Sequence, residues 1–139
     1  LASATTLADF KGCKATTQIN TAWSEYVEEI PDVKIIPYPE TTAEVVMQVA
    51  MGAVDCAVLD YPTGYSATLS NPDVAIVRFE KGKGFVTPPD CSEAVSVAVD
   101  DGNTVLQTAI GKAMDAIGWD QAKMDKYMDL AIKTQPLSE

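Results

Sequence analysis

The chain alternates between two kinds of hydrophobic pattern, and this alternation is the feature that most restricts its fold. Short apolar segments that predict strands lie at residues 14–19, 33–38, 56–60 and 74–79. Between them, apolar residues recur every three or four positions, which is typical of amphipathic helices. Because a strand–helix–strand order needs crossover connections, we expect an α/β fold with an open, mainly parallel sheet flanked by helices.

Capping residues predict where the helices begin. Asn20 and Thr21 follow the first strand and are good N-cap residues for a helix that starts at once. Thr41 or Thr42 caps the second helix, and Glu44 is placed to complete a capping box. A shorter third helix precedes the fourth strand, so each of the first three strands is followed by a helix.

Residues 80–93 break the alternation and predict a boundary in the chain. This stretch holds two glycines and two prolines and has no periodicity. Beyond it we expect a C-terminal strand at 94–100 and two helices, one from Asn103 to Gly118 and one over 119–133.

Composition excludes several classes of function. The formal net charge of -10 argues against a nucleic-acid partner, and the absence of histidine excludes catalytic triads that depend on it. Cys13, Cys56 and Cys91 match no metal-ligand spacing, and buried free thiols are favoured over a structural disulfide. We therefore predict no catalytic residues, no bound metal and no cofactor.

Two groups of polar residues fall at the carboxyl ends of the first and third predicted strands, where open parallel sheets bind ligands. The first group lies where the first strand passes into the first helix, and it comprises Gln18, Asn20, Thr21 and Ala22. Free backbone N–H groups at this point suit an anion, and Thr21 adds a hydroxyl. The second group is Asp60, whose carboxylate suits an ammonium group.

The two groups become neighbours if the sheet has the common 2-1-3 strand order. An anion site beside a cation site then fits a zwitterion. Ordinary local roles remain open for each residue: Asn20 and Thr21 as helix caps, and Asp60 as the cap of the next helix. Tyr61 is either a packing residue or a platform for the ligand.

Four stretches of the chain resemble a known family in their order and spacing, and the resemblance covers roughly residues 7–133. LADFKGCKATTQINTAWSEY is similar to the family's "DLKGKKVGVQxGT", and VVMQVAMGAVDCAVLDYPTGY is similar to its helix, glycine and "DAVVxD" with a proline-containing turn. NPDVAIVRFEKGKGF and AVSVAVDDGNTVLQTAIGKAMDAI resemble its return strand, "IAVKKG" and C-terminal helix. The family is that of bacterial extracellular solute-binding proteins of amino-acid ABC transporters, family 3, with the type II periplasmic binding fold.

The resemblance implies roles for two of the site residues. Thr21 corresponds to the threonine that binds the ligand's α-carboxylate, and Asp60 corresponds to the acid that binds its α-amino group. Two positions depart from the family pattern. Asn20 replaces the usual glycine, so either its backbone is left-handed or the ligand approaches differently, and Ala22 replaces a second hydroxyl.

The resemblance also implies a division into lobes. Residues 7–88 correspond to ligand-binding lobe two, and residues 94–139 correspond to the C-terminal segment of lobe one, whose N-terminal half is absent. We expect a fragment of a non-enzymatic, extracytoplasmic receptor, periplasmic or lipid-anchored, that delivers a small amino acid to ABC permease membrane subunits. The alternative is a sensor domain of a receptor kinase or regulator with the same fold.

Two further interpretations follow from the sequence. The apolar segment 94–100 would be an exposed edge without its native partners, so we expect either a domain-swapped homodimer or coverage by the chain's own two helices. An enzyme would need Asp60 with Glu25 or Glu40 as a general acid and base, and the lack of histidine disfavours it.

Overall fold

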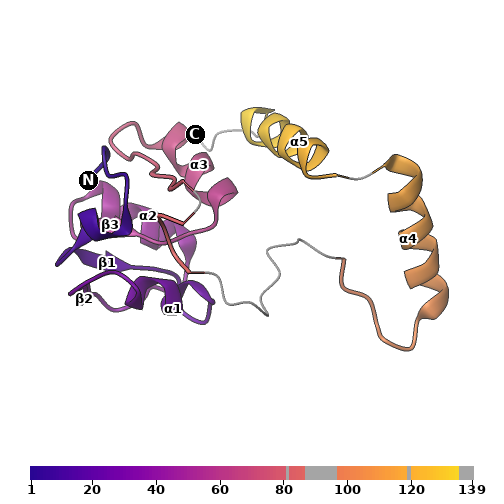
Figure 1. Cartoon of the computed structure of the whole chain (residues 1–139), viewed down its shortest axis with the longest axis horizontal. Coiled ribbons are helices and arrows are strands. Elements are labelled where there is room, and N and C mark those ends of the chain that lie inside the picture. The colour runs from indigo at the N-terminus through magenta and orange to yellow at the C-terminus, as the bar shows by residue number, and fades with distance from the viewer. Residues whose placement is uncertain (81, 87–96, 119, 135–139) are drawn as a thin grey trace. The chain divides into compact units, whose positions relative to one another are not determined.

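The computed structural model describes residues 1–80, 82–86, 97–118 and 120–134 (Figure 1). The chain separates into two compact units, Leu1–Thr87 and Pro88–Glu139, and each is described by itself. The lobe assignments at 7–88 and 94–139 stay predictions.

The first unit is built on a three-stranded open sheet whose order is β2-β1-β3. β1 (Lys14–Thr16) pairs in parallel with β2 (Lys34–Ile35) on one side and with β3 (Cys56–Ala57) on the other. This confirms the expected parallel α/β sheet and its 2-1-3 order. The strands are shorter than predicted, and just after β2 the Ile36 N–H donates to the Ala15 carbonyl oxygen of β1 at 2.9 Å.

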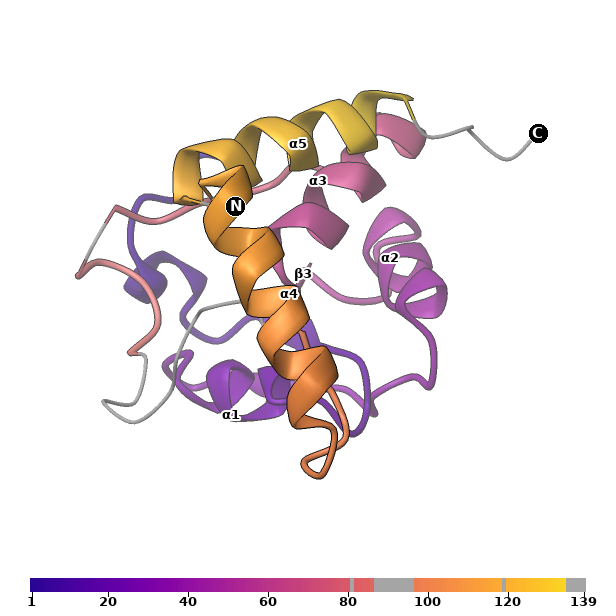
Figure 2. The same cartoon turned by 90° about the vertical axis from the view of Figure 1, so that its right-hand side faces the viewer.

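Helices connect and flank these strands. α1 (Trp23–Glu28) joins β1 to β2, α2 (Thr42–Ala50) joins β2 to β3, and α3 (Tyr61–Ser70) follows β3. Figure 2 shows α1 and α2 on opposite sides of the sheet, as right-handed crossovers in this strand order require.

The start of α2 confirms the predicted capping box. The backbone N–H of Glu44 donates to the Thr41 hydroxyl at 3.3 Å, and the Thr41 N–H donates to the Glu44 carboxylate at 3.1 Å. Two donors at the first turn, where no helical acceptor exists, are satisfied in this way.

Two expectations about strands are wrong or lie partly outside the described residues. Residues 74–79 are not in a strand, because they form no ladder with the sheet. Of the predicted strand at 94–100, residues 97–100 are not in a strand and the others lie outside the described residues. The segment before β1 contains a 3-10 helix, Leu7–Phe10.

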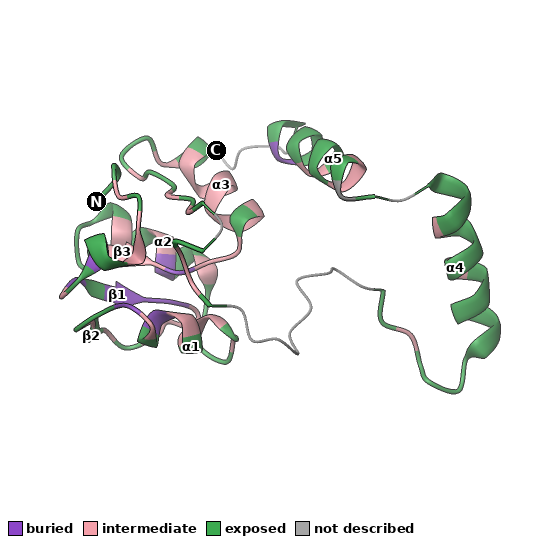
Figure 3. Ribbon diagram, viewed as in Figure 1, coloured by how far each residue is buried: buried purple, intermediate pink, exposed green. Residues whose placement is uncertain are grey.

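The core lies around β1 and α1. Figure 3 colours its buried residues purple. Its buried members are Phe10, Cys13, Ala15, Val27, Ile30 and Val58. Phe79 closes one side, because its ring lies 6.0 Å from the ring of Phe10 and 6.0 Å from that of Phe85, both edge to face. The segment after α3 therefore belongs to the core although it forms no strand.

Two thiols meet inside this core. The sulfur atoms of Cys13 and Cys56 lie 3.4 Å apart as free thiols. Burial raises the pKa of the Cys56 thiol, and the neighbouring Cys13 thiol raises it further. Both side chains therefore act as small apolar groups that pack the start of β3 against Cys13, the residue just before β1.

The second unit contains α4 (Thr104–Ile117) and α5 (Gln121–Thr134). As predicted, Asn103 caps α4 by accepting the Leu106 N–H at 3.1 Å, and Gly118 ends it with a left-handed φ of 61°. Asp120 accepts the Lys123 N–H at 2.8 Å and starts α5. In the described part of the chain, no helix is long and apolar enough to cross a membrane.

We predict that Gly84→Ala destabilises the first unit. A Cβ at Gly84 would lie 2.6 Å from Cδ2 and 2.8 Å from Cβ of Phe79, inside the aromatic core. Such overpacking costs about 1–3 kcal/mol, measurable by urea denaturation. Gly111→Ala is the matched control, because it meets open space in α4 and should stabilise that helix by about 0.5–1 kcal/mol. Equal denaturation midpoints for Gly84→Ala and the wild type would contradict this packing.

Candidate functional site

The candidate site lies at the carboxyl edge of the sheet, where the chain leaves β1 and β3. Because these strands are paired, the loop after β1 and the start of α3 lie beside each other. The hydroxyl of Thr17, which is fully buried, donates to the carbonyl oxygen of Val58 at 2.7 Å. This bond ties the two loops together at their base.

The loop after β1 turns at Asn20 with a left-handed backbone, φ 59°. The sequence had left open whether Asn20 is left-handed or the ligand approaches differently, and the structure has the first conformation. Asparagine tolerates it better than other residues with a Cβ. Ala22, two positions later, has helical angles, φ -63° and ψ -17°.

Backbone donors gather at this turn. Within the described residues, the N–H groups of Asn20, Thr21 and Ala22 have no hydrogen-bond acceptor. Successive N–H groups near a left-handed residue form a concave site for an anion. The site predicted for a carboxylate therefore has unused donors.

The expected caps of α1 are wrong. Ala22 is the N-cap residue and its side chain makes no capping bond. Instead, the Thr21 hydroxyl donates to the Gln18 carbonyl oxygen at 2.7 Å. To donate to a ligand carboxylate, Thr21 would have to give up that bond, so the backbone N–H groups are the stronger donors here.

The side chain of Gln18 connects the loop after β1 to the segment that leads into α2. Its side-chain amide donates to the Glu40 carbonyl oxygen at 3.0 Å and accepts from the Thr42 hydroxyl at 2.8 Å. Both ends of the amide are thus engaged by the segment that leads into α2. Its predicted contact with a ligand remains untested, and its observed role is to position the loop.

Asp60 is the N-cap of α3. One carboxylate oxygen, Oδ1, accepts the Thr63 N–H at 2.9 Å, as the capping alternative required. Among the described residues, the second oxygen has no hydrogen-bond partner. The half-buried carboxylate therefore caps the helix with one oxygen and presents the other for a cation.

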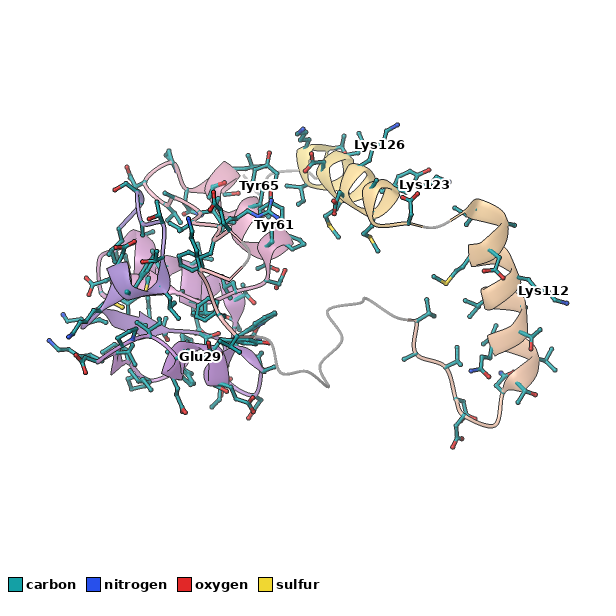
Figure 4. The ribbon with its side chains drawn as sticks, viewed as in Figure 1. Glu29, Tyr61, Tyr65, Lys112, Lys123 and Lys126 are labelled. Atoms are coloured by element: carbon teal, nitrogen blue, oxygen red, sulfur yellow. The ribbon has the colours of Figure 1, made fainter. Side chains whose placement is uncertain are left out.

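Tyr61 follows Asp60 and is 37% exposed. Its ring is parallel to that of Tyr65, with centroids 5.8 Å apart and an interplanar angle of 6° (Figure 4). The guanidinium carbon of Arg78 lies 4.0 Å from the centroid of the Tyr61 ring. Tyr61 thus packs against two side chains while keeping part of its surface open.

Sequence reasoning did not identify Arg78. One signal was available, since Arg78 is the single arginine of the chain. The acid and base pairs considered for an enzyme are not brought together by any contact of the described residues, and those residues contain no cluster of three potential metal ligands.

Comparison with known proteins supports the fold. A solved structure described as the substrate binding protein of an amino acid ABC transporter matches with a TM-score of 0.62 and 19% sequence identity. The match covers 94% of this chain and 54% of that chain, so this chain spans about half the length of the protein it matches. No protein-family model and no curated protein matches. The expected resemblance to a lobe of such a binding protein is confirmed at the level of fold.

We predict that the left-handed turn makes position 20 sensitive to a Cβ. Asn20→Ala should be about 1 kcal/mol less stable than Asn20→Gly, because glycine adopts positive φ without the strain that alanine incurs. Thermal and urea denaturation of both variants measure the difference. Equal stability would mean that the loop relaxes out of the left-handed conformation.

Proposed function

We propose that this chain supplies one wall of an amino-acid binding site in the substrate-binding component of an ABC transporter. The observation that carries the proposal is the pairing of unlike groups across β1 and β3. Unused N–H donors at residues 20–22 suit an α-carboxylate, and the free oxygen of Asp60 suits an α-ammonium group.

The remainder of the site would come from lobe one of a longer receptor. Small-ligand sites bury most of the ligand surface, which a single sheet edge does not do. The likeness in fold to a protein about twice as long supports a longer receptor in which residues 7–88 are lobe two and 94–139 belong to lobe one. Such a receptor would be non-enzymatic and extracytoplasmic, and its closed form would deliver the ligand to permease subunits.

We propose that the second unit promotes association when the chain is isolated. The apolar side chains of Val105, Leu106 and Ile117 in α4 are 81%, 44% and 52% exposed. We propose that a second copy, in a swapped homodimer, covers them.

Size-exclusion chromatography with light scattering tests this association. A dimer that dissociates on Val105→Ser and Leu106→Ser substitution is expected, because these substitutions remove apolar surface from the proposed interface. A strict monomer at all concentrations would contradict the homodimer.

We predict that Asp60→Asn separates the two roles of this side chain. Asparagine caps helices as well as aspartate does, so the free energy of unfolding should change by less than about 0.5 kcal/mol. Loss of the charge should weaken amino-acid binding by about tenfold to a hundredfold, because hydrogen bonds to charged groups contribute about 1.5–3 kcal/mol.

Isothermal titration of the twenty amino acids measures this effect, on this chain and on the longer receptor polypeptide proposed above. Asp60→Ala is the companion variant, because it should lose both the cap and the binding. If Asp60→Asn bound amino acids as the wild type does, Asp60 would be only a helix cap.

A further inference from the structure

The segment 74–79 runs along α3 with its side chains alternating between two surroundings. Towards α3, a Cβ placed on Gly64 would lie 3.2 Å from Cδ1 of Ile76, and Arg78 lies over the Tyr61 ring. The intervening Val77 and the following Phe79 pack against the core cluster. Two contacts at a spacing of two residues therefore fix this segment, and with it Arg78, against the first turns of α3.

The guanidinium of Arg78 retains its hydrogen-bonding capacity. The residue is exposed, and it forms no ion pair within the described part of the chain. Stacking on Tyr61 uses the flat face of the group, whereas its N–H donors lie in the plane and point out from its edge. A stacked guanidinium of this kind is ready to bind a carboxylate with two parallel hydrogen bonds.

Aromatic stacking holds the cation in place. Tyr65 lies parallel to Tyr61, one helical turn further along α3, so Tyr61 cannot turn without disturbing that contact. Holding the guanidinium before a ligand arrives reduces the conformational entropy lost on binding. The three side chains Tyr61, Tyr65 and Arg78 are called the arginine shelf below.

The arginine shelf adjoins the proposed amino-acid site. Tyr61 follows Asp60 directly, so a fixed positive charge and a carboxylate share the start of α3. An amino acid held by its ammonium group at Asp60 and its α-carboxylate at residues 20–22 has only its side chain left to recognise. A guanidinium stacked on Tyr61, the residue that follows Asp60, would select a side chain with a negative charge.

We propose that Arg78 is the specificity-determining residue of this site and that the ligand is a dicarboxylic amino acid. The side-chain carboxylate of the ligand would accept two hydrogen bonds from Arg78. This inference rests on the proposed function, because it assigns the ligand class of the same site.

Two pairs of amino acids test the proposal: glutamate with glutamine, and aspartate with asparagine. The members of each pair differ in side-chain charge and have nearly the same shape. Each is titrated calorimetrically into the longer receptor polypeptide and into this chain. We expect the wild type to bind glutamate or aspartate about tenfold to a hundredfold more tightly than the matching amide. Arg78→Gln should abolish that preference and leave amide binding within about twofold.

Two control variants complete the experiment. Arg78→Lys should keep only part of the preference, because an ammonium lacks the planar fork. Lys83→Gln removes an exposed cation that is already paired with Glu80 at 2.7 Å, and it should leave the preference unchanged. Circular dichroism and urea denaturation of each variant check that it is folded.

The outcomes separate this inference from the proposed function. Equal binding of acid and amide, unchanged in Arg78→Gln but lost in Asp60→Asn, would overturn the dicarboxylic ligand and leave the amino-acid site standing. Binding of no amino acid by the folded longer receptor would overturn the proposed function, and this inference with it.

Discussion

The structure of the first unit depends on one strand that has neighbours on both sides. β1 is central, and Ala15, Thr16 and Thr17 at and just beyond its end are completely buried. Because β2 and β3 both run parallel to it, the loops that follow all three strands emerge at the same edge. The buried hydrogen bond from Thr17 to Val58 fixes the spacing of two of these loops. The candidate site is a consequence of that pairing.

Features set by neighbouring residues were predictable from the sequence. The Thr41–Glu44 capping box and the Asn103 and Gly118 ends of α4 depend on contacts within one helical turn. Strand ends and the segment 74–79 were not predicted correctly, because pairing depends on distant partners. The apolar alternation of 74–79 reflects burial against the core, which an extended segment achieves without joining the sheet.

The site shows the same division. The left-handed backbone of Asn20 was one of two alternatives considered, and the capping alternative for Asp60 is confirmed, although β3 ends at Ala57, three residues before it. The bracing of Gln18 by residues of the next loop, and the stacking of Arg78 on Tyr61, join residues far apart in the sequence. The pattern of a single sequence carries no information about such contacts. The roles of Gln18 and Arg78 at the site could therefore be described only from the three-dimensional structure.

Side chains of the segment 74–79 contact the core of the first unit on one side and α3, next to the proposed ligand site, on the other. Phe79 lies between two aromatic rings of the core, and the residue before it holds the cation over Tyr61. A substitution that shifts the backbone at Phe79 is expected to shift Arg78 as well, because the two residues are consecutive. Substitutions in the core that leave the sheet intact can then change which ligand is preferred, although they do not contact the ligand. Evolution of a new ligand preference need not begin at residues that contact the ligand.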